Sequence, residues 1–171
     1  LLMAGVGLDG EVTRAVERKP LKRWGIFGYI LMGLWLAPGY RGFRVHLYLN
    51  GRRMRTNALE IIIGNTQLLG GFFKSTPRAK CDDGLLDVCL VYKRGLFGRI
   101  GVLWDFFRHR EPHRLLVRYI TCTSVRIRTF QPIAVQLDGE AAGDTPVIFT
   151  VAPSALKVVV PQRTPEGIFS K

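Results

Sequence analysis

Two acidic residues, Asp138 and Glu140, lie on either side of Gly139 at the end of an apolar run, in the segment VQLDGE. Because Asp-Gly between apolar stretches favours a tight hairpin turn, the simplest interpretation of this segment is structural. The alternative is functional: the turn directs a carboxylate at another group. The local sequence supports both interpretations about equally, so these residues alone do not decide between them.

A second acidic cluster, KCDDGLLD, contains Asp82, Asp83 and Asp87. Asp83-Gly84 before an apolar run is again typical of a turn. The same loop could hold a hard cation, because one carboxylate and nearby backbone carbonyls supply the oxygen ligands that Mg²⁺ and Ca²⁺ prefer. On the local sequence alone, a plain turn is the stronger interpretation.

Glycines near the middle of the chain form the third candidate. Gly64-Asn65 and the pair Gly70-Gly71 could let the backbone approach a phosphate group closely. The segment matches neither the P-loop nor the dinucleotide-binding pattern. By itself it therefore predicts no nucleotide site.

The charge balance narrows the classes of partner. The chain has 25 Lys and Arg residues against 13 Asp and Glu, a formal net charge of +12. Such a surface attracts nucleic acid, anionic lipid headgroups or a phosphorylated substrate. Zinc-finger, helix-turn-helix and ribonucleoprotein patterns are all missing from the sequence. We therefore expect no nucleic-acid partner, and a basic nucleic-acid-binding β domain is only a minor alternative.

Cysteine usage and hydropathy bear on the compartment. The three cysteines form no CxxC pair, which indicates neither a disulfide framework nor a zinc site and favours a reducing compartment. The first residues, LLMAGVGLDG, lack the charged start of a signal peptide. Residues 24–40 carry no charge, but glycines and a proline interrupt them, and a spanning helix needs about twenty apolar residues. We expect a helix that is buried or lies at an interface.

The elements that must position these residues are mostly strands, in a chain of one-domain length. Alternating residues around Asn50-Gly51 predict a hairpin. We expect helices near residues 9–16, 21–36 and 95–109, and strands within 1–7, 43–55, 59–64, 85–92, 116–128, 133–137, 147–151 and 156–160. This order predicts an α+β, β-rich fold, an antiparallel β-sandwich or twisted pair of sheets with inserted helices.

Five motifs occur in order: GVGLDGEV, WGIFGYI, IIIGNTQLLGGFFKSTPRAKCDDGLLDV, VQLDGE and TPVIFTVAPSALKVVVP. Together they resemble the C-terminal domain of the soluble diacylglycerol kinases and related lipid kinases, which include sphingosine and ceramide kinases. The resemblance implies one C-terminal kinase domain, a β-sandwich with helical additions, over residues 1–161 and a tail over residues 162–171. It also implies that the N-terminal ATP-binding domain, with its GGDGT-type motif, lies outside this chain.

The resemblance assigns roles to the acidic candidates. Glu140 matches the family's candidate catalytic base, which would accept the proton of a lipid hydroxyl as that oxygen attacks the γ-phosphate of ATP. Asp138 would help to position the turn or a metal network. Asp83 would supply the carboxylate of a structural Mg²⁺ site, with the backbone carbonyls of Lys80 and Leu85 as further ligands.

The glycine segment and the basic surface also gain an interpretation. Asn65 and Gly70-Gly71 match a family segment near the cleft between the two domains, where packing is at least as good a role as phosphate contact. The resemblance implies a cytoplasmic enzyme, peripherally associated with a membrane, that uses ATP and Mg²⁺ to phosphorylate a lipid hydroxyl. Diacylglycerol is the default acceptor. Residues 96–114 form either an interfacial docking segment or a core-packed helix with a solvated basic face.

Two further expectations concern the chain as it stands. Without an ATP-binding domain it should transfer no phosphate on its own. The main alternative function keeps the fold but drops the activity, leaving a basic membrane-binding or regulatory module. The sequence leaves the acceptor lipid and the oligomeric state open, a homodimer included.

Overall fold

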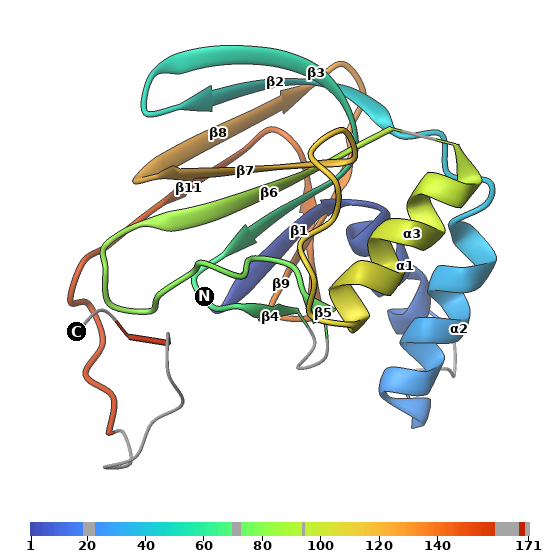
Figure 1. The fold of residues 1–171 in the computed structure, drawn as a ribbon, viewed down its shortest axis with the longest axis horizontal. Helices are drawn as coiled ribbons and strands as arrows, with labels where there is room; N and C mark the ends of the chain where they lie inside the picture. The colour runs from blue at the N-terminus through green and yellow to red at the C-terminus, as the bar shows by residue number, and fades with distance from the viewer. Residues whose placement is uncertain (19–22, 70–72, 94, 160–167, 170–171) are drawn as a thin grey trace.

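The computed structural model describes residues 1–18, 23–69, 73–93, 95–159 and 168–169 (Figure 1). Within these ranges the chain forms three helices, α1 (Leu8–Glu17), α2 (Ile26–Leu36) and α3 (Leu96–Phe107). The strands there are β1 (Met3–Gly7), β2 (Phe43–Leu49), β3 (Arg52–Gly64), β4 (Leu68–Leu69), β5 (Phe73–Lys74), β6 (Leu86–Tyr92), β7 (Val117–Cys122), β8 (Ser124–Thr129), β9 (Ala134–Leu137), β10 (Glu140–Asp144) and β11 (Val147–Thr150).

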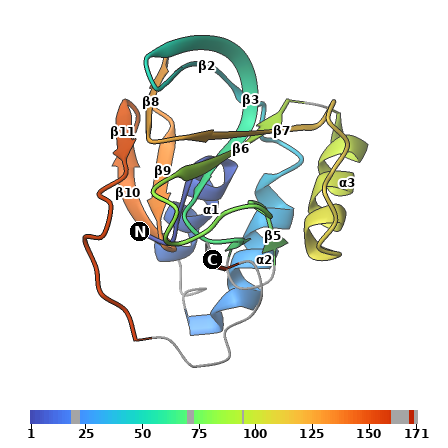
Figure 2. The same cartoon turned by 60° about the vertical axis from the view of Figure 1, so that its left-hand side comes forward.

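Nine of these strands form one antiparallel sheet in the order β10-β9-β1-β3-β2-β8-β11, with β6 and β7 branching from β3. The length of β3 makes the branch, because residues 52–58 pair with β2, whereas residues 60–64 pair with β1 and also with β6. Figures 1 and 2 show the strands bending round a common interior, so that the sheet is nearly closed. The predicted antiparallel β-sandwich with inserted helices is confirmed.

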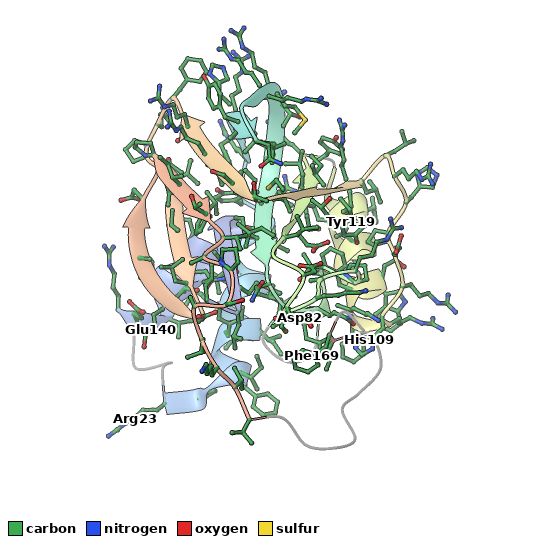
Figure 3. All side chains as sticks on the ribbon, turned by 90° about the vertical axis from the view of Figure 1, so that its left-hand side faces the viewer. Arg23, Asp82, His109, Tyr119, Glu140 and Phe169 are labelled. Atoms are coloured by element: carbon green, nitrogen blue, oxygen red, sulfur yellow. The ribbon has the colours of Figure 1, made fainter. Side chains whose placement is uncertain are left out.

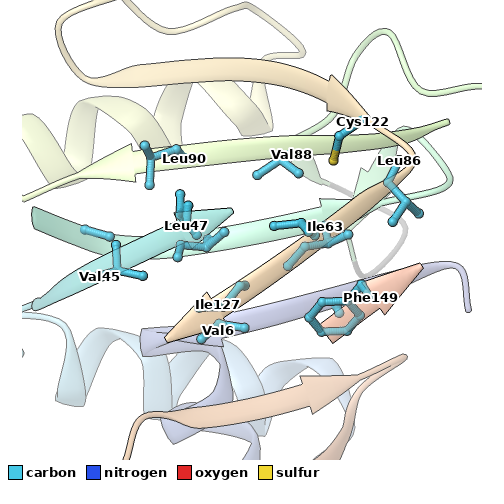
Figure 4. Packing of buried hydrophobic residues seen from close by; sticks show 14 of the residues in the cluster. Val6, Val45, Leu47, Ile63, Leu86, Val88, Leu90, Cys122, Ile127 and Phe149 are labelled. Atoms are coloured by element: carbon cyan, nitrogen blue, oxygen red, sulfur yellow. The ribbon is translucent and has the colours of Figure 1, made fainter. Parts of the chain in front are cut away.

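The main core fills the inside of this curved sheet (Figure 4). Its side chains come from strands far apart in the sequence. The fully buried ones include Val6, Leu47, Ile63, Leu90 and Ile127. Because successive residues of a strand point to opposite faces, a slip of one residue would turn these side chains toward solvent. The apolar pattern therefore fixes the register of the sheet.

The helices bury their inner faces in two smaller clusters. Val12 of α1 packs with Met32 of α2, and α1 also contacts β9. Val102 and Phe106 of α3 pack in a cluster that includes Leu59 of β3. These contacts place α1 next to the strand that leads into the Asp138–Gly139 turn. None of the helices in the described ranges is long and apolar enough to cross a bilayer.

The hairpin predicted at Asn50-Gly51 is confirmed. Both residues have positive φ, 47° and 81°, as a two-residue turn between twisted strands requires. The side chain of Asn50 then closes the neighbouring turn, since its Oδ1 accepts hydrogen bonds from the backbone N–H groups of Thr123 and Ser124 at 3.0 and 3.1 Å. The region 116–128 is accordingly two strands, β7 and β8, separated at Thr123.

Other boundaries differ from the prediction. The second helix begins at Ile26, directly after Gly25, which has φ of 54°. The strand expected at 156–160 is wrong, since residues 156–159 form no strand and residue 160 lies outside the described ranges. Val159 is almost fully exposed there. A β-branched run favours a strand only when a neighbouring strand and a buried face are available, and the described residues offer this run neither.

Candidate functional site at the Asp138–Gly139 turn

The turn predicted at Asp138-Gly139 joins β9 to β10. Asp138 and Gly139 have positive φ, 48° and 91°, and Leu137 pairs with Glu140 directly after them. These are the features of a two-residue hairpin loop, in which Asp tolerates the left-handed conformation and Gly adopts it without strain. The turn therefore has a defined shape, and Glu140 follows it at a fixed position.

Asp138 ties the turn to the beginning of the chain. Its Oδ1 accepts hydrogen bonds from the backbone N–H groups of Leu2 and Met3, at 2.9 and 2.8 Å, and its own N–H donates to the carbonyl of Met3 at 2.9 Å. Two bonds to the side chain of Asp138 and one from its backbone therefore hold the turn against the start of β1. Its part in a metal network stays a prediction.

Glu140 is the first residue of β10, at the end of the sheet path, and its side chain is exposed. Figure 3 labels it at the periphery of the molecule, clear of the core. β10 is held from one side by α1, because Arg14 forms a 2.7 Å ion pair with Asp144 and Glu17 accepts a hydrogen bond from the N–H of Ala141 at 2.9 Å. An exposed carboxylate on a braced turn can reach a ligand, and its role as a base stays a prediction.

A buried polar cluster lies behind the turn and was not predicted from the sequence. The side-chain oxygen Oε1 of Gln136 accepts a hydrogen bond from the N–H of Gly139 at 2.8 Å, and its Nε2 donates to Oδ2 of Asp9 at 2.6 Å. The N–H of Asp9 in turn donates to Oε2 of Glu60 at 2.8 Å. This chain of bonds connects β3, α1 and β9 with the residue before Glu140.

The two carboxyl groups of this cluster are both buried. Burial raises the pKa of Asp9 to about 6, although the hydrogen bond from Gln136 works in the opposite direction. Burial, followed by the nearby charge of Asp9, raises the pKa of Glu60 well above its ordinary value. Oε1 of Glu60 accepts no hydrogen bond from the described residues. A desolvated site disfavours two negative charges close together, which is why the pKa values of both carboxyl groups are raised.

The sequence signal for this cluster is the spacing of glycines around Asp9 in GVGLDG. A Cβ at Gly5 would lie 2.3 Å from Oδ2 of Asp9, and a Cβ at Gly10 would lie 2.4 Å from the carbonyl oxygen of Ala134. Gly7 also has φ of 130°, which side chains rarely adopt. The glycines therefore make room for a buried carboxyl group between β1, α1 and β9.

Asn65 lies close to the same end of the sheet. Its N–H donates to the carbonyl of Leu2 at 2.9 Å, and the N–H of Leu2 donates to Asp138. Leu2 therefore connects Asn65 to Asp138, with one hydrogen bond to each of them. Gly70 and Gly71 lie outside the described residues, so the structure does not bear on their predicted role.

The Asp83 loop is a separate segment. Oδ1 of Asp83 accepts a hydrogen bond from the N–H of Leu85 at 2.9 Å, and Gly84 has φ of 71°, which confirms a turn here. The N–H of Cys81 donates to the carbonyl of Ile168 at 3.0 Å. Figure 3 labels Asp82 in this loop at some distance from Glu140.

The Asp83 loop contains the right kinds of atom for a hard cation. Among the described residues no three His, Cys, Asp or Glu side chains gather as a metal cluster. The predicted site does not need such a cluster, because its other ligands are the backbone carbonyls of Lys80 and Leu85. Oδ2 of Asp83 accepts no hydrogen bond from the described residues, so one oxygen can serve a cation while Oδ1 holds the loop. The residues fit the predicted Mg²⁺ site in type, and their role as ligands stays a prediction.

The curved sheet and its inserted helices form a β-sandwich-like domain. Residues 3–160 match the family model of the YegS C-terminal NAD kinase beta sandwich-like domain. The match covers nearly the whole chain, and the chain belongs to this family.

Individual relatives agree with this assignment. The chain is 26% identical over 166 residues to the diacylglycerol kinase of Bacillus subtilis strain 168, covering 97% of this chain and 55% of that protein. It is 26% identical over 162 residues to the diacylglycerol kinase of Staphylococcus carnosus, covering 94% of this chain and 52% of that protein. The crystal structure of a candidate diacylglycerol kinase from Bacillus anthracis has the same fold, with a TM-score of 0.64 and 24% identity over 90% of this chain and 49% of that one. The chain spans about half the length of the relatives it matches.

Proposed function

We propose that this chain is the C-terminal domain of a lipid kinase and contributes to the ATP-dependent phosphorylation of a lipid hydroxyl. The observation that carries the proposal is the match to diacylglycerol kinases over almost the whole chain. Diacylglycerol is the acceptor we propose first, because both relatives are named for it, and the product would be phosphatidic acid.

The proposed base is Glu140. As the lipid hydroxyl oxygen forms a bond to the γ-phosphorus of ATP, the bond from that phosphorus to the leaving ADP oxygen breaks, and the hydroxyl proton passes to the Glu140 carboxylate. A well-placed general base contributes about 10²–10⁴-fold to such a step. The exposed position of Glu140 after a turn braced by Asp138 and Gln136 supports this role. Mg²⁺ would neutralise charge on the transferred phosphoryl group.

We propose that ATP is bound mainly outside this chain, since the relatives are about twice as long. Asn65 and the pair Gly70-Gly71 belong to the segment that we propose lies near the cleft, either in packing or in contact with phosphate. The 171-residue chain alone would then transfer no phosphate. Turnover by the purified chain would contradict this division of labour.

We further propose that Asp83, with the carbonyls of Lys80 and Leu85, holds a structural Mg²⁺ ion. The hydrogen bond from the N–H of Leu85 to Asp83 holds this carboxylate in the same loop as the two carbonyls, and it supports the proposal. We also place the intact protein in the cytoplasm at a membrane surface, where its lipid acceptor resides. The net charge of +12 supports attraction to anionic lipid there.

The test is a phosphate-transfer assay on the intact protein that carries this domain, with ATP, Mg²⁺ and diacylglycerol in mixed micelles. Glu140→Gln should reduce kcat by about a hundredfold or more, because the amide cannot accept the proton. Glu111→Gln is the matched control, since Glu111 is also exposed but pairs with Arg78 on another segment. Wild-type activity with no effect of Glu140→Gln would remove the base from this turn. No transfer to diacylglycerol, sphingoid bases or phospholipids would overturn the kinase proposal.

A further inference from the structure

An apolar surface lies on the outer side of α2. Phe27, Ile30, Leu31, Leu34 and Trp35 are all exposed, and their spacing of three, four, seven and eight residues puts them on one side of the helix. The opposite side of α2 is satisfied within the fold, where Met32 packs on α1. The helix is therefore apolar on both sides, which a helix exposed only to water would not be.

The outer side of α3 has the same character. Phe97, Ile100, Trp104 and Phe107 are exposed at helical spacing, while Val102 and Phe106 are buried. One side of α3 therefore packs on the core, as one of the two predicted alternatives requires, but the other side is apolar and not basic. Interfacial docking of this segment stays a prediction.

The two helices belong to one face of the molecule. The guanidinium of Arg99 in α3 donates a 2.6 Å hydrogen bond to the carbonyl of Ala37, directly after α2. Figures 1 and 2 show α2 and α3 as separate helices, both on the side of the molecule away from β11. We call the exposed apolar residues of α2 and α3, together with Trp24, the α2–α3 face.

The α2–α3 face is rich in tryptophan, which indicates the kind of partner that it fits. All three tryptophans of the chain lie on it, Trp24, Trp35 and Trp104, with exposed fractions of 63%, 69% and 57%. Tryptophan side chains concentrate at membrane–water interfaces, where the ring enters the apolar layer and the indole N–H stays hydrated. A monomeric protein rarely exposes so many large apolar side chains without a partner.

Charge at the edge of the α2–α3 face selects the kind of partner. α2 contains no charged residue, and the exposed Arg23 stands just before it. After α3 come Arg108, Arg110 and Arg114, all exposed, and the Arg108 guanidinium lies 5.8 Å from the Trp104 ring centre. An apolar surface with a cationic edge is complementary to a bilayer of anionic lipids, whose phosphates lie just outside the acyl layer.

We propose that the α2–α3 face docks the protein on the surface of a bilayer that contains anionic lipids. Its aromatic and aliphatic side chains enter the boundary between headgroups and acyl chains, and Arg23, Arg108 and Arg110 contact headgroup phosphates. The eleven residues of α2 rise about 16 Å, roughly half the thickness of the hydrocarbon layer, so the helix lies at the interface and does not cross it. The inference rests on the proposed function, because a lipid kinase needs access to a membrane. The exposed apolar surface and its cationic edge are observed independently of that function.

The experiment measures binding of the intact protein to sedimented vesicles, without ATP. One vesicle set contains phosphatidylcholine and phosphatidylglycerol, and the other contains phosphatidylcholine alone. The wild type should bind the mixed vesicles more tightly, with a shift of tryptophan fluorescence to shorter wavelength. Phe27→Ser combined with Leu34→Ser should weaken binding about tenfold or more, since each loses an apolar side chain from the acyl boundary.

Two controls complete the design. Arg108→Gln with Arg110→Gln should weaken binding to the mixed vesicles but not to phosphatidylcholine, and added salt should reproduce the effect. Phe130→Ser, which removes a similarly exposed aromatic ring from the loop after β8, should leave vesicle binding unchanged. The thermal unfolding of each variant tests whether the substitution at the exposed position alters the fold.

Several outcomes would overturn the proposal. The first is that the wild type binds neither kind of vesicle. The second is that the variant with both Phe27→Ser and Leu34→Ser binds as tightly as the wild type. The third is that this variant loses stability or loses a dimer that the wild type forms, which would mean that polypeptide covers the α2–α3 face. Micellar kinase activity distinguishes the two proposals. Vesicle binding without any phosphate transfer would leave the docking surface standing and remove the kinase function, while micellar activity without vesicle binding would do the reverse.

Discussion

The Nε2 amide of Gln136 donates a 2.6 Å hydrogen bond to Oδ2 of Asp9, while the Oε1 of the same amide accepts one from Gly139 in the turn. One buried side chain therefore connects the first helix with the residue next to Glu140. The position of the proposed base depends on a polar contact in the interior, and several measurable consequences result.

Gln136→Leu should both destabilise the fold and reduce catalysis. The substitution leaves the buried Asp9 carboxyl without its partner, which costs about 1–3 kcal/mol, and it releases the N–H of the exposed Gly139. Urea unfolding measures the loss of stability. A fall in kcat at unchanged KM for ATP, in a variant still folded at the assay temperature, would indicate misplacement of Glu140. Gln131→Leu is the control, because Gln131 is exposed.

Stability should depend on pH through Asp9. Its pKa is raised from 3.8 to about 6, so protons bind more tightly to the folded protein than to the unfolded one. The contribution is fully present below about pH 4 and is lost as the pH rises through 6, a change on the order of 3 kcal/mol. The raised pKa of Glu60 extends the decrease to higher pH.

Asp9→Asn should flatten this dependence between pH 4 and 6, since the amide keeps an acceptor for Gln136 but does not titrate. Urea unfolding at several pH values measures both slopes. The same slope in Asp9→Asn as in the wild type would show that other groups determine the acid dependence of stability.

Asp138→Ala should cost about 2 kcal/mol or more of unfolding free energy. It removes the acceptor of two backbone N–H groups, those of Leu2 and Met3, and it places alanine at φ of 48°. Asp138→Asn should cost far less, because asparagine retains an oxygen acceptor and tolerates positive φ. Equal losses in the two variants would assign the stabilisation to the charge of Asp138.

Millimolar Mg²⁺ should raise the melting temperature of the wild type, because a ligand that binds only the folded state stabilises it. Asp83→Asn should abolish most of this increase, while its amide oxygen still accepts the hydrogen bond from Leu85. Asp82→Asn, one residue earlier, is the control. A similar Mg²⁺ response in the Asp83→Asn variant would remove the proposed ion from this loop.

The parts of the fold that local chemistry determines could be predicted from the sequence. Asn50-Gly51 and Asp138-Gly139 specify hairpins by their own conformational preferences, and both form as predicted. The run predicted as a strand at 156–160 has an equally good composition, but its described residues 156–159 form no strand, because strand formation also depends on a partner that composition does not reveal.

The buried cluster could not be predicted for a related reason. Asp9, Glu60 and Gln136 are far apart in the chain, and only the pairing of β1 with both β3 and β9 brings them together. The sequence contains the glycines at positions 5, 7 and 10, but it does not reveal that the Asp9 carboxyl and the backbones of β3 and β9 pack against them. The apolar outer sides of α2 and α3 posed the same difficulty, since spacing alone cannot tell a buried stripe from an exposed one.

The place of β1 in the sheet has a consequence for biosynthesis. β1 precedes the other strands of this domain in the sequence, yet it is an interior strand whose partners on its two edges are β3 and β9, with Ala4 opposite Leu137. During translation the apolar sequence MAGVG therefore waits with one edge unpaired until almost the whole domain has left the ribosome. Contacts so distant in sequence slow folding and prolong the exposure of strand edges. We expect nascent chains that end before β9 to aggregate or to need a chaperone.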